Sequence, residues 1–147
     1  MRKVLVLFAA LAISVGGLAY QGHAGSLAAA NEEKKFASIE PMEAKKLIET
    51  TADLQLIDVR SVQEYQQGAL PGSTLIPFWE IMQGKYSLPK DKPILLICAV
   101  GGRSLAAGQY LSMKGYREVY NLSGGLSAWA KQRVPLPNPP PRVKGTH

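Results

Sequence analysis

The sequence has very few residues of the kinds that form disulfide bonds, metal sites or histidine-assisted nucleophiles. Its 147 residues include one cysteine, Cys98, and two histidines, His23 near the start and His147 at the end. A single cysteine cannot form an internal disulfide bond, so Cys98 is either a free thiol or one half of an intermolecular bridge. Because neither histidine falls within the expected domain, we exclude a Cys–His nucleophile pair and a zinc site with Cys and His ligands. We expect no metal and no cofactor, so any activation of Cys98 comes from backbone dipoles and cations.

Acidic residues are outnumbered, with 11 Asp and Glu against 17 Lys and Arg and a formal net charge of +6. The basic residues are scattered, and Lys34-Lys35 and Lys45-Lys46 stand among glutamates. Since no basic stripe carries interleaved aromatic residues, we do not expect a nucleic-acid partner. A mildly cationic protein suits a small anionic substrate. The composition is ordinary for one globular domain.

Long apolar runs are confined to the N-terminus, where Met1-Arg2-Lys3 precedes the uncharged stretch Val4–Ala19. A short basic head before an apolar stretch is typical of a secretory signal peptide, here residues 1–24, which predicts a periplasmic protein. Cleavage after Ala19 or Ala30 is the alternative to cleavage after Ala24. An uncleaved anchor is a further alternative, although the stretch is short for a span of about 20 residues. After cleavage we expect no stable membrane span.

The rest of the chain divides into three parts. Residues 25–37 are expected to be a mobile linker, and residues 38–133 form the expected domain. Residues 134–147 contain five prolines in the seven residues 135–141. This composition predicts an extended, unpacked tail.

The central stretch of the domain surrounds the cysteine. Ile94–Ile97 is a continuous apolar run, which predicts a strand buried on both faces of a parallel sheet. A helix is predicted over Leu105–Lys114, with Gly115 as its stop. Cys98 therefore lies at the carboxyl end of a buried strand, where open α/β sheets bind their ligands.

The residues after Cys98 favour negative charge. Gly101 and Gly102 permit a tight loop whose N–H groups converge, and a helix N-terminus follows. Arg103 adds a planar cation. A cysteine above such a loop ionises readily, and the loop suits an oxyanion such as thiosulfate, sulfite or phosphate. The alternative is a small buried cysteine that simply ends a strand.

Other segments also alternate between strand and helix patterns, which indicates an α/β fold. We predict the following elements: a helix at Pro41–Glu49, a strand at Leu54–Arg60, a helix from the capping box at Ser61 to about Gly68, a short strand within residues 68–77, a short helix at Phe78–Met82, a strand at Arg117–Leu122 and a short helix within Ser123–Lys131.

Polar residues follow the second predicted strand as well. Asp58 and Arg60 share an edge with Cys98 if the two strands are parallel, and Arg60 is positioned to pair with Glu64 around the first helical turn. A structural salt-bridge network is the preferred interpretation of Arg60 and Glu64, and it stays open for Asp58. Phe78, Trp79 and Val100 are candidates for pocket walls.

Four separated segments resemble the rhodanese family of sulfurtransferase domains. They are Asp58-Val-Arg60 with Glu64-Tyr65, Gly68-Ala-Leu-Pro-Gly72-Ser-Thr-Leu-Ile-Pro77, Cys98-Ala-Val-Gly-Gly-Arg-Ser104, and Gly115 to Trp129 with its Gly124-Gly125 pair. These segments follow the family's order across about residues 38–133. Ala69 stands where the family usually has histidine. The resemblance implies a small parallel-stranded sheet flanked by helices on both faces.

The resemblance also implies a chemistry. Cys98 would take a sulfane sulfur from thiosulfate or a similar donor as a persulfide and pass it to cyanide or a thiol. Arg103 would hold the anionic donor, and Asp58 and Arg60 would support the loop. The persulfide would be bound by the N–H groups of the loop: Ala99, Val100, Gly101, Gly102 and Ser104.

Three other functions remain open at this point. A cysteine phosphatase is disfavoured. Cysteine phosphatases resemble a pattern with five residues between the cysteine and the arginine, and here four residues separate Cys98 from Arg103. A non-enzymatic persulfide carrier or binding module is the alternative from another class. A redox sensor that forms intermolecular disulfides is the third. Oligomeric state is not indicated by the sequence.

Overall fold

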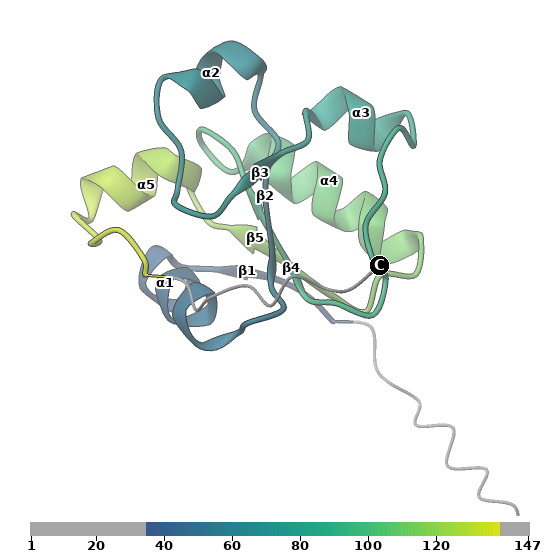
Figure 1. Cartoon of the computed structure of the whole chain (residues 1–147), viewed down its shortest axis with the longest axis horizontal. Helices are drawn as coiled ribbons and strands as arrows, with labels where there is room; N and C mark the ends of the chain where they lie inside the picture. Colours follow the sequence, from purple (N-terminus) through teal and green to yellow (C-terminus); the bar gives the residue numbers. More distant parts are fainter. Residues whose placement is uncertain (1–34, 139–147) are drawn as a thin grey trace, which may run out of the picture. The chain divides into compact units, whose positions relative to one another are not determined.

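The computed structural model describes residues 35–138. The predicted signal peptide, residues 25–34 of the predicted linker and residues 139–147 of the tail lie outside this range. Five parallel strands form one sheet in the order β1-β5-β4-β2-β3 (Figure 1). Their bounds are β1 Lys35–Ile39, β2 Gln55–Asp58, β3 Thr74–Leu75, β4 Ile94–Ile97 and β5 Glu118–Leu122. The helices are α1 Pro41–Thr50, α2 Val62–Gln66, α3 Phe78–Met82, α4 Gly102–Met113 and α5 Gly125–Lys131.

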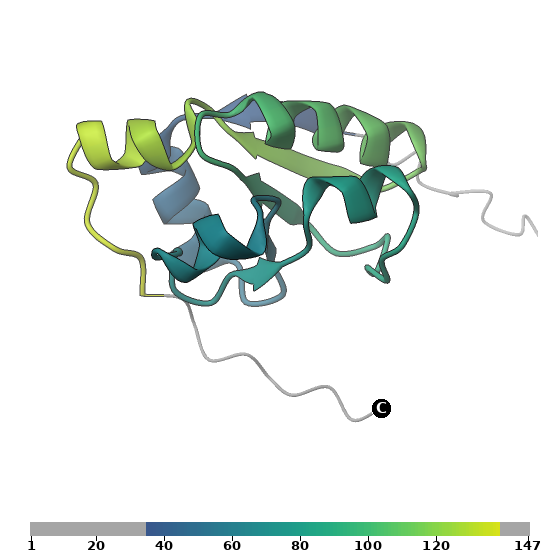
Figure 2. The same cartoon turned by 90° about the horizontal axis from the view of Figure 1, so that it is seen from above.

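Each face of the sheet is covered by helices. Side chains alternate between the faces of a strand, so β4 contributes Leu95 and Ile97 to one core and Ile94 and Leu96 to the other. The first core includes residues of α1 and α5, and the second includes residues of α3 and α4. In Figure 2 the strands run between α1 and α5 on the left and α3 and α4 on the right. The predicted α/β fold, with helices on both faces of a parallel sheet, is confirmed.

The predicted central strand has the bounds that its apolar run indicated, because all four of its residues are fully buried. The helix after it begins at Gly102, three residues earlier than predicted. The second strand is shorter than predicted and ends at Asp58. Beyond it, the Arg60 N–H group donates to the Asp58 carboxylate at 3.0 Å, and not to an adjacent strand.

The predicted linker is wrong at its end. Residues 35–37 belong to β1, where Lys35, Phe36 and Ala37 pair with Glu118, Val119 and Tyr120. This strand lies at the edge of the sheet and is only partly buried. An edge strand needs no continuous apolar run, which explains why the charged sequence around Lys35 concealed it.

The predicted unpacked tail is also corrected at its beginning. Val134 and Pro137 are buried, and Val134 belongs to the core beside α1 and α5. The Asn138 N–H group donates to the Glu49 carboxylate on α1 at 3.2 Å. Proline prevents regular structure here but does not prevent packing. In residues 35–138 no helix has the length and apolar character needed to cross a membrane.

Candidate active site

The sequence placed Cys98 at the carboxyl end of a buried strand, and the structure does the same. Cys98 follows β4 directly and is 1 % exposed. The segments that follow β2, β3 and β5 reach the same edge because the sheet is parallel throughout. This edge therefore brings together the beginnings of α2, α3, α4 and α5 (Figure 1).

The backbone conformation of Gly101 directs its N–H group at the cysteine sulfur. Its φ of 93° lies in the left-handed region, and its N–H group donates to Cys98 Sγ at 3.0 Å. A Cβ atom at this position would lie 3.0 Å from the Gly124 backbone nitrogen. Both the dihedral angle and the close approach therefore require glycine.

Ser104 contributes a second donor from the first turn of α4. It is fully buried, and its Oγ lies 3.3 Å from Cys98 Sγ and 3.1 Å from the Gly101 carbonyl oxygen. Its single hydroxyl proton can be donated to only one of these acceptors at a time, and a thiolate is the stronger acceptor.

Two opposing effects act on the pKa of Cys98. Burial of the thiol is the largest single effect and raises the pKa. Hydrogen bonds from the Ser104 hydroxyl and from the backbone N–H groups of Ser104, Val100 and Gly101 together outweigh burial and lower the pKa below its ordinary value of 9.0. The loop thus stabilises negative charge on sulfur, which is the reactive form of cysteine.

The outer side of the same loop is held by the beginning of α5. The N–H groups of Leu126 and Ser127 donate to the carbonyl oxygens of Cys98 and Ala99, both at 2.9 Å. Gly125 has φ 60°, and a Cβ atom there would overlap the Cys98 carbonyl oxygen. With these carbonyl groups engaged outside, the loop N–H groups are free to face the sulfur. Our sequence reasoning about the site missed this contact, although the Gly124-Gly125 pair was its signal.

Arg103 is engaged by a carboxylate. Its guanidinium donates to both oxygens of Glu64, at 2.8 Å from Nη1 and 2.5 Å from Nη2. The same Glu64 carboxylate accepts from the Ser61 N–H group at 2.9 Å, which completes the predicted capping box of α2. Hydrogen bonding to Arg103, followed by that to Ser61, lowers the pKa of Glu64 to about 2. The predicted pairing of Arg60 with Glu64 is therefore wrong, because Glu64 reaches across to α4.

Arg60 instead pairs with Asp58. Arg60 Nη2 lies 2.7 Å from Asp58 Oδ2, and its Nε donates to the same carboxylate at 3.0 Å. Arg60 Nη2 also donates to the Gly68 carbonyl oxygen at 2.7 Å. Asp58 is fully buried and Arg60 nearly so. Between them, Val59 donates from its N–H group to the Ile97 carbonyl oxygen at 2.8 Å, which ties this turn to the strand that carries Cys98.

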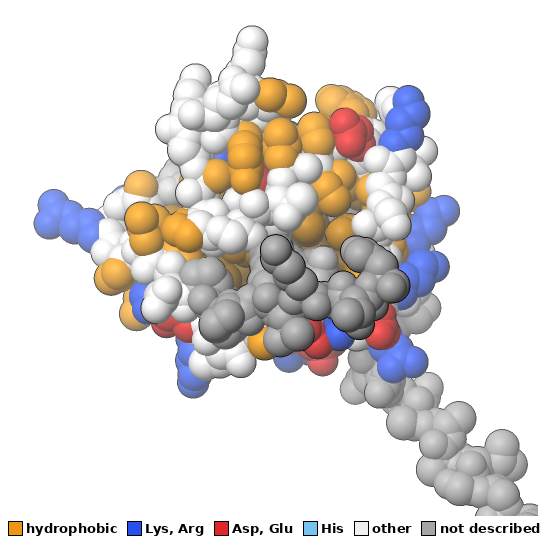
Figure 3. All heavy atoms as spheres, viewed as in Figure 1, with side chains coloured by type: hydrophobic (Ala, Val, Ile, Leu, Met, Phe, Trp, Pro, Cys, Tyr) orange, Lys and Arg blue, Asp and Glu red, His pale blue; other side chains and the backbone are white. Residues whose placement is uncertain are grey.

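Large apolar side chains are exposed along this edge. Trp79, in the first turn of α3, is 69 % exposed, Val100 of the loop is 68 % exposed, and Val62 of α2 is 52 % exposed. Phe78 is only partly buried and contacts Trp79 edge to face, with ring centroids 5.1 Å apart. Figure 3 shows hydrophobic side chains gathered between α2 and α3 on the viewed face. The candidates for pocket walls thus lie at the same edge as Cys98.

The structure brings the predicted site residues together at one edge, but it does so in two groups. Cys98, Gly101 and Ser104 are joined by hydrogen bonds, and Ala99, Val100 and Gly102 belong to the same loop and helix start. Asp58 and Arg60 form a separate ion pair. The role of Arg103 in holding an anionic donor stays a prediction. Within residues 35–138 no cluster of three or more His, Cys, Asp or Glu residues could hold a metal ion.

We expect Ser104→Ala to raise the pKa of Cys98, because a hydrogen-bond donor to the thiolate is lost. The measurement is the rate of alkylation by iodoacetamide as a function of pH. At pH 7 the rate should fall about threefold or more, because less thiolate is present. Ser112→Ala, near the other end of α4, is the matched control and should leave the profile unchanged. An unchanged profile in Ser104→Ala would show that the backbone N–H groups alone set the pKa.

The edge described above defines a class of protein: an α/β domain with one buried cysteine held over a loop of backbone N–H groups. The family model described as "Rhodanese-like domain" matches residues 40–132. The chain belongs to the rhodanese-like domain family.

Relatives with sulfurtransferase names and solved structures agree with this assignment. A protein named "Sulfurtransferase" from Allochromatium vinosum is 37% identical over 89 residues, which are 60% of this chain and 83% of that protein. A protein named "Thiosulfate sulfurtransferase GlpE" from Pseudomonas paraeruginosa is 32% identical over 94 residues, 64% of this chain and 84% of the other. The crystal structure of a rhodanese-like domain protein from Staphylococcus aureus matches with a TM-score of 0.58 at 32% identity, covering 63% of this chain and 90% of that one. The crystal structure of a rhodanese-related protein from Thermoplasma volcanium matches with a TM-score of 0.59 at 31% identity, covering 67% of this chain and 95% of that one.

Proposed function

We propose that this protein is a sulfurtransferase that carries a sulfane sulfur as a persulfide on Cys98. The observation that carries the proposal is the position of Cys98 Sγ, buried and facing the Gly101 N–H group at 3.0 Å and the Ser104 hydroxyl at 3.3 Å. Membership of a family whose relatives are named as sulfurtransferases supports it. Cys98 is also the sole cysteine of the chain, so the persulfide has one possible location.

The proposed reaction has two steps. The Cys98 thiolate attacks the outer sulfur of thiosulfate, the S–S bond of the donor breaks, and sulfite leaves with the bonding electron pair. Cys98 then carries the sulfur as a persulfide anion. In the second step cyanide or a thiolate attacks that outer sulfur, and Cys98 leaves as the thiolate, so the enzyme returns to its first state.

The loop has a defined part in both steps. The negative charge moves between Sγ and the sulfur bound to it, and the N–H groups of the loop are already oriented before the charge arrives. Such preorganised donors stabilise charge without reorganisation during the reaction. Gly101 and Ser104 therefore serve the thiolate, the persulfide and the transition state between them.

The intact mass of the protein tests the proposal. After incubation with thiosulfate, we expect the mass to increase by one sulfur atom, and cyanide should remove this increase with formation of thiocyanate. The mass of the protein before treatment also tests the proposed export, because cleavage after Ala24 removes residues 1–24. Absence of a sulfur adduct with thiosulfate and with an organic persulfide would overturn the proposed function.

A further inference from the structure

We propose that Glu64 determines which sulfur donor this site accepts, and that it favours organic persulfides with an apolar substituent over the thiosulfate dianion. The inference rests on the proposed function of Cys98. Glu64 lies on α2, in a different segment from the cysteine loop. Its part in the capping box of α2 is structural, and the role in donor choice is additional to it.

The first observation is the pairing of Arg103. The arginine of the cysteine loop is the natural receptor for an anionic donor, but both of its terminal nitrogens donate to Glu64, at 2.8 and 2.5 Å. The Ser61 N–H group holds the same carboxylate at 2.9 Å, so Glu64 is fixed from its own helix as well. A two-point guanidinium–carboxylate pair fixes the direction of the arginine and cancels most of its charge at a distance.

The second observation is the balance of charge at this edge. The segments that follow the carboxyl ends of β2, β3, β4 and β5 are residues 58–64, 76–80, 98–105 and 123–127. They contain two cations, Arg60 and Arg103, against three carboxylates, Asp58, Glu64 and Glu80. Both cations are held in carboxylate pairs. These four segments thus carry a small net negative charge, although the whole chain has a formal net charge of +6.

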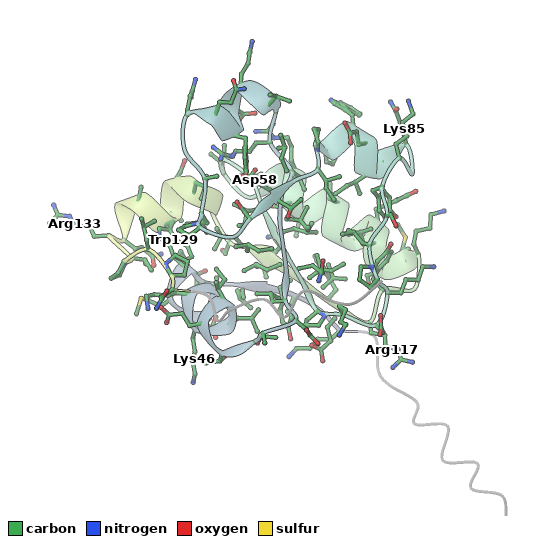
Figure 4. The ribbon with its side chains drawn as sticks, viewed as in Figure 1. Lys46, Asp58, Lys85, Arg117, Trp129 and Arg133 are labelled. Atoms are coloured by element: carbon green, nitrogen blue, oxygen red, sulfur yellow. The ribbon has the colours of Figure 1, made fainter. Side chains whose placement is uncertain are left out.

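The other cations of residues 35–138 belong to other segments of the chain. Figure 4 labels Lys46, Lys85, Arg117 and Arg133 at the periphery of the domain, each far from Asp58 in the view. Salt screens exposed charges increasingly with distance. Cations outside the four segments therefore act on a dianion at the Cys98 thiolate more weakly than a cation within these segments would.

The two donor classes place different charges beside that thiolate. Thiosulfate brings two negative charges, and the sulfite that leaves retains both of them. An organic persulfide, R–S–S⁻, brings one: the thiolate attacks its outer sulfur, the S–S bond breaks, and the thiolate R–S⁻ leaves. Since the edge offers no unpaired cation in the four segments named above, the donor with less charge meets less repulsion.

The third observation concerns the substituent R. Trp79 and Val100 are each more than two-thirds exposed at this edge, and Val62 and Leu105 are also exposed. These side chains lie in the first turns of α2, α3 and α4 or in the cysteine loop. They offer apolar contact to an organic substituent, whereas a sulfonate group gains nothing from them.

The experiment compares two donors in two variants. For thiosulfate and for benzyl persulfide, kcat/KM is measured in the natural protein, in Glu64→Gln and in Glu80→Gln. Glu80→Gln is the matched control, since it removes the same charge from the same edge without touching Arg103. The ratio of kcat/KM for thiosulfate to that for benzyl persulfide should rise about tenfold in Glu64→Gln and less than about twofold in Glu80→Gln. The ratio cancels the intrinsic reactivity of each donor.

Each outcome decides the matter. A ratio that stays constant in Glu64→Gln, or that rises equally in both variants, overturns the role of Glu64 while leaving the Cys98 persulfide intact. A failure of Cys98 to gain sulfur from either donor overturns the proposed function, and the inference with it. The melting temperature of each variant is measured in parallel. Should Glu64→Gln fail to fold, Glu64→Asp keeps the acidic cap but withdraws the carboxylate from Arg103, and the ratio should rise in the same direction by a smaller factor.

Discussion

Replacing Cys98 with serine is expected to reduce thiosulfate:cyanide sulfur transfer by about 10³-fold or more, down to the uncatalysed background. A serine hydroxyl is a weak nucleophile at its ordinary pKa, and neither of the two histidines of the chain lies within residues 35–138 to act as its base. It also cannot form a persulfide. The measurement is thiocyanate production together with the intact mass after thiosulfate treatment.

The fold should survive this change. Serine is only slightly smaller than cysteine, and its Oγ can accept the hydrogen bond that the Gly101 N–H group now donates to sulfur. We therefore expect a melting temperature close to that of the natural protein. Activity retained at more than about one-hundredth of the natural level would contradict the persulfide mechanism, since no second cysteine exists to replace Cys98.

The loop was predictable because its chemistry is local. A buried strand, one cysteine and two glycines before a helix are adjacent in the sequence, and their geometry follows from backbone preferences. Gly101 illustrates this, since its positive φ and its N–H bond to sulfur both follow from its place three residues after Cys98. The order of elements was predictable for the same reason, because each strand or helix carries its own pattern.

Contacts between distant segments were not predictable in this way. Glu64 and Arg103 are 39 residues apart, and the sequence offered Arg60 as a nearer partner for Glu64. The structure shows that Arg60 turns back to Asp58, two residues away, because both side chains are buried at the end of β2. A pattern in the sequence identifies charged residues but not which of them meet.

The edge strand β1 was missed for a physical reason as well. The β1 strand pairs on one side only and keeps polar residues, so its sequence resembles a linker. Its identity depends on β5, about 80 residues later, which supplies the hydrogen-bonding partner. Val134 at the start of the tail likewise packs against elements that precede it in the chain. In each case the partner, and not the segment itself, determines the structure.

The buried ion pair leads to the second prediction, in which Asp58→Ala destabilises the domain strongly. Asp58 is fully buried and accepts from the Arg60 Nε, Nη2 and backbone N–H groups. The Arg60 guanidinium now donates to the Asp58 carboxylate and to the Gly68 carbonyl oxygen. Without Asp58 it stays buried and keeps only the Gly68 carbonyl oxygen of these two acceptors. Removing one partner of a buried pair typically costs about 3–5 kcal/mol, a large part of the stability of a small domain. Urea unfolding of both proteins measures the change.

Asp53→Ala is the matched control, because it removes the same side chain from an ion pair at the surface. Asp53 pairs with Lys92, and their side chains are 66 % and 37 % exposed. Exposed pairs contribute little to stability, so we expect almost no change in the free energy of unfolding. A loss of stability in Asp58→Ala as small as that in Asp53→Ala would contradict a structural role for the buried pair. A large loss of stability would in turn explain how Asp58 supports the site: its pair with Arg60 fixes the turn whose Val59 N–H group bonds Ile97, the residue before Cys98.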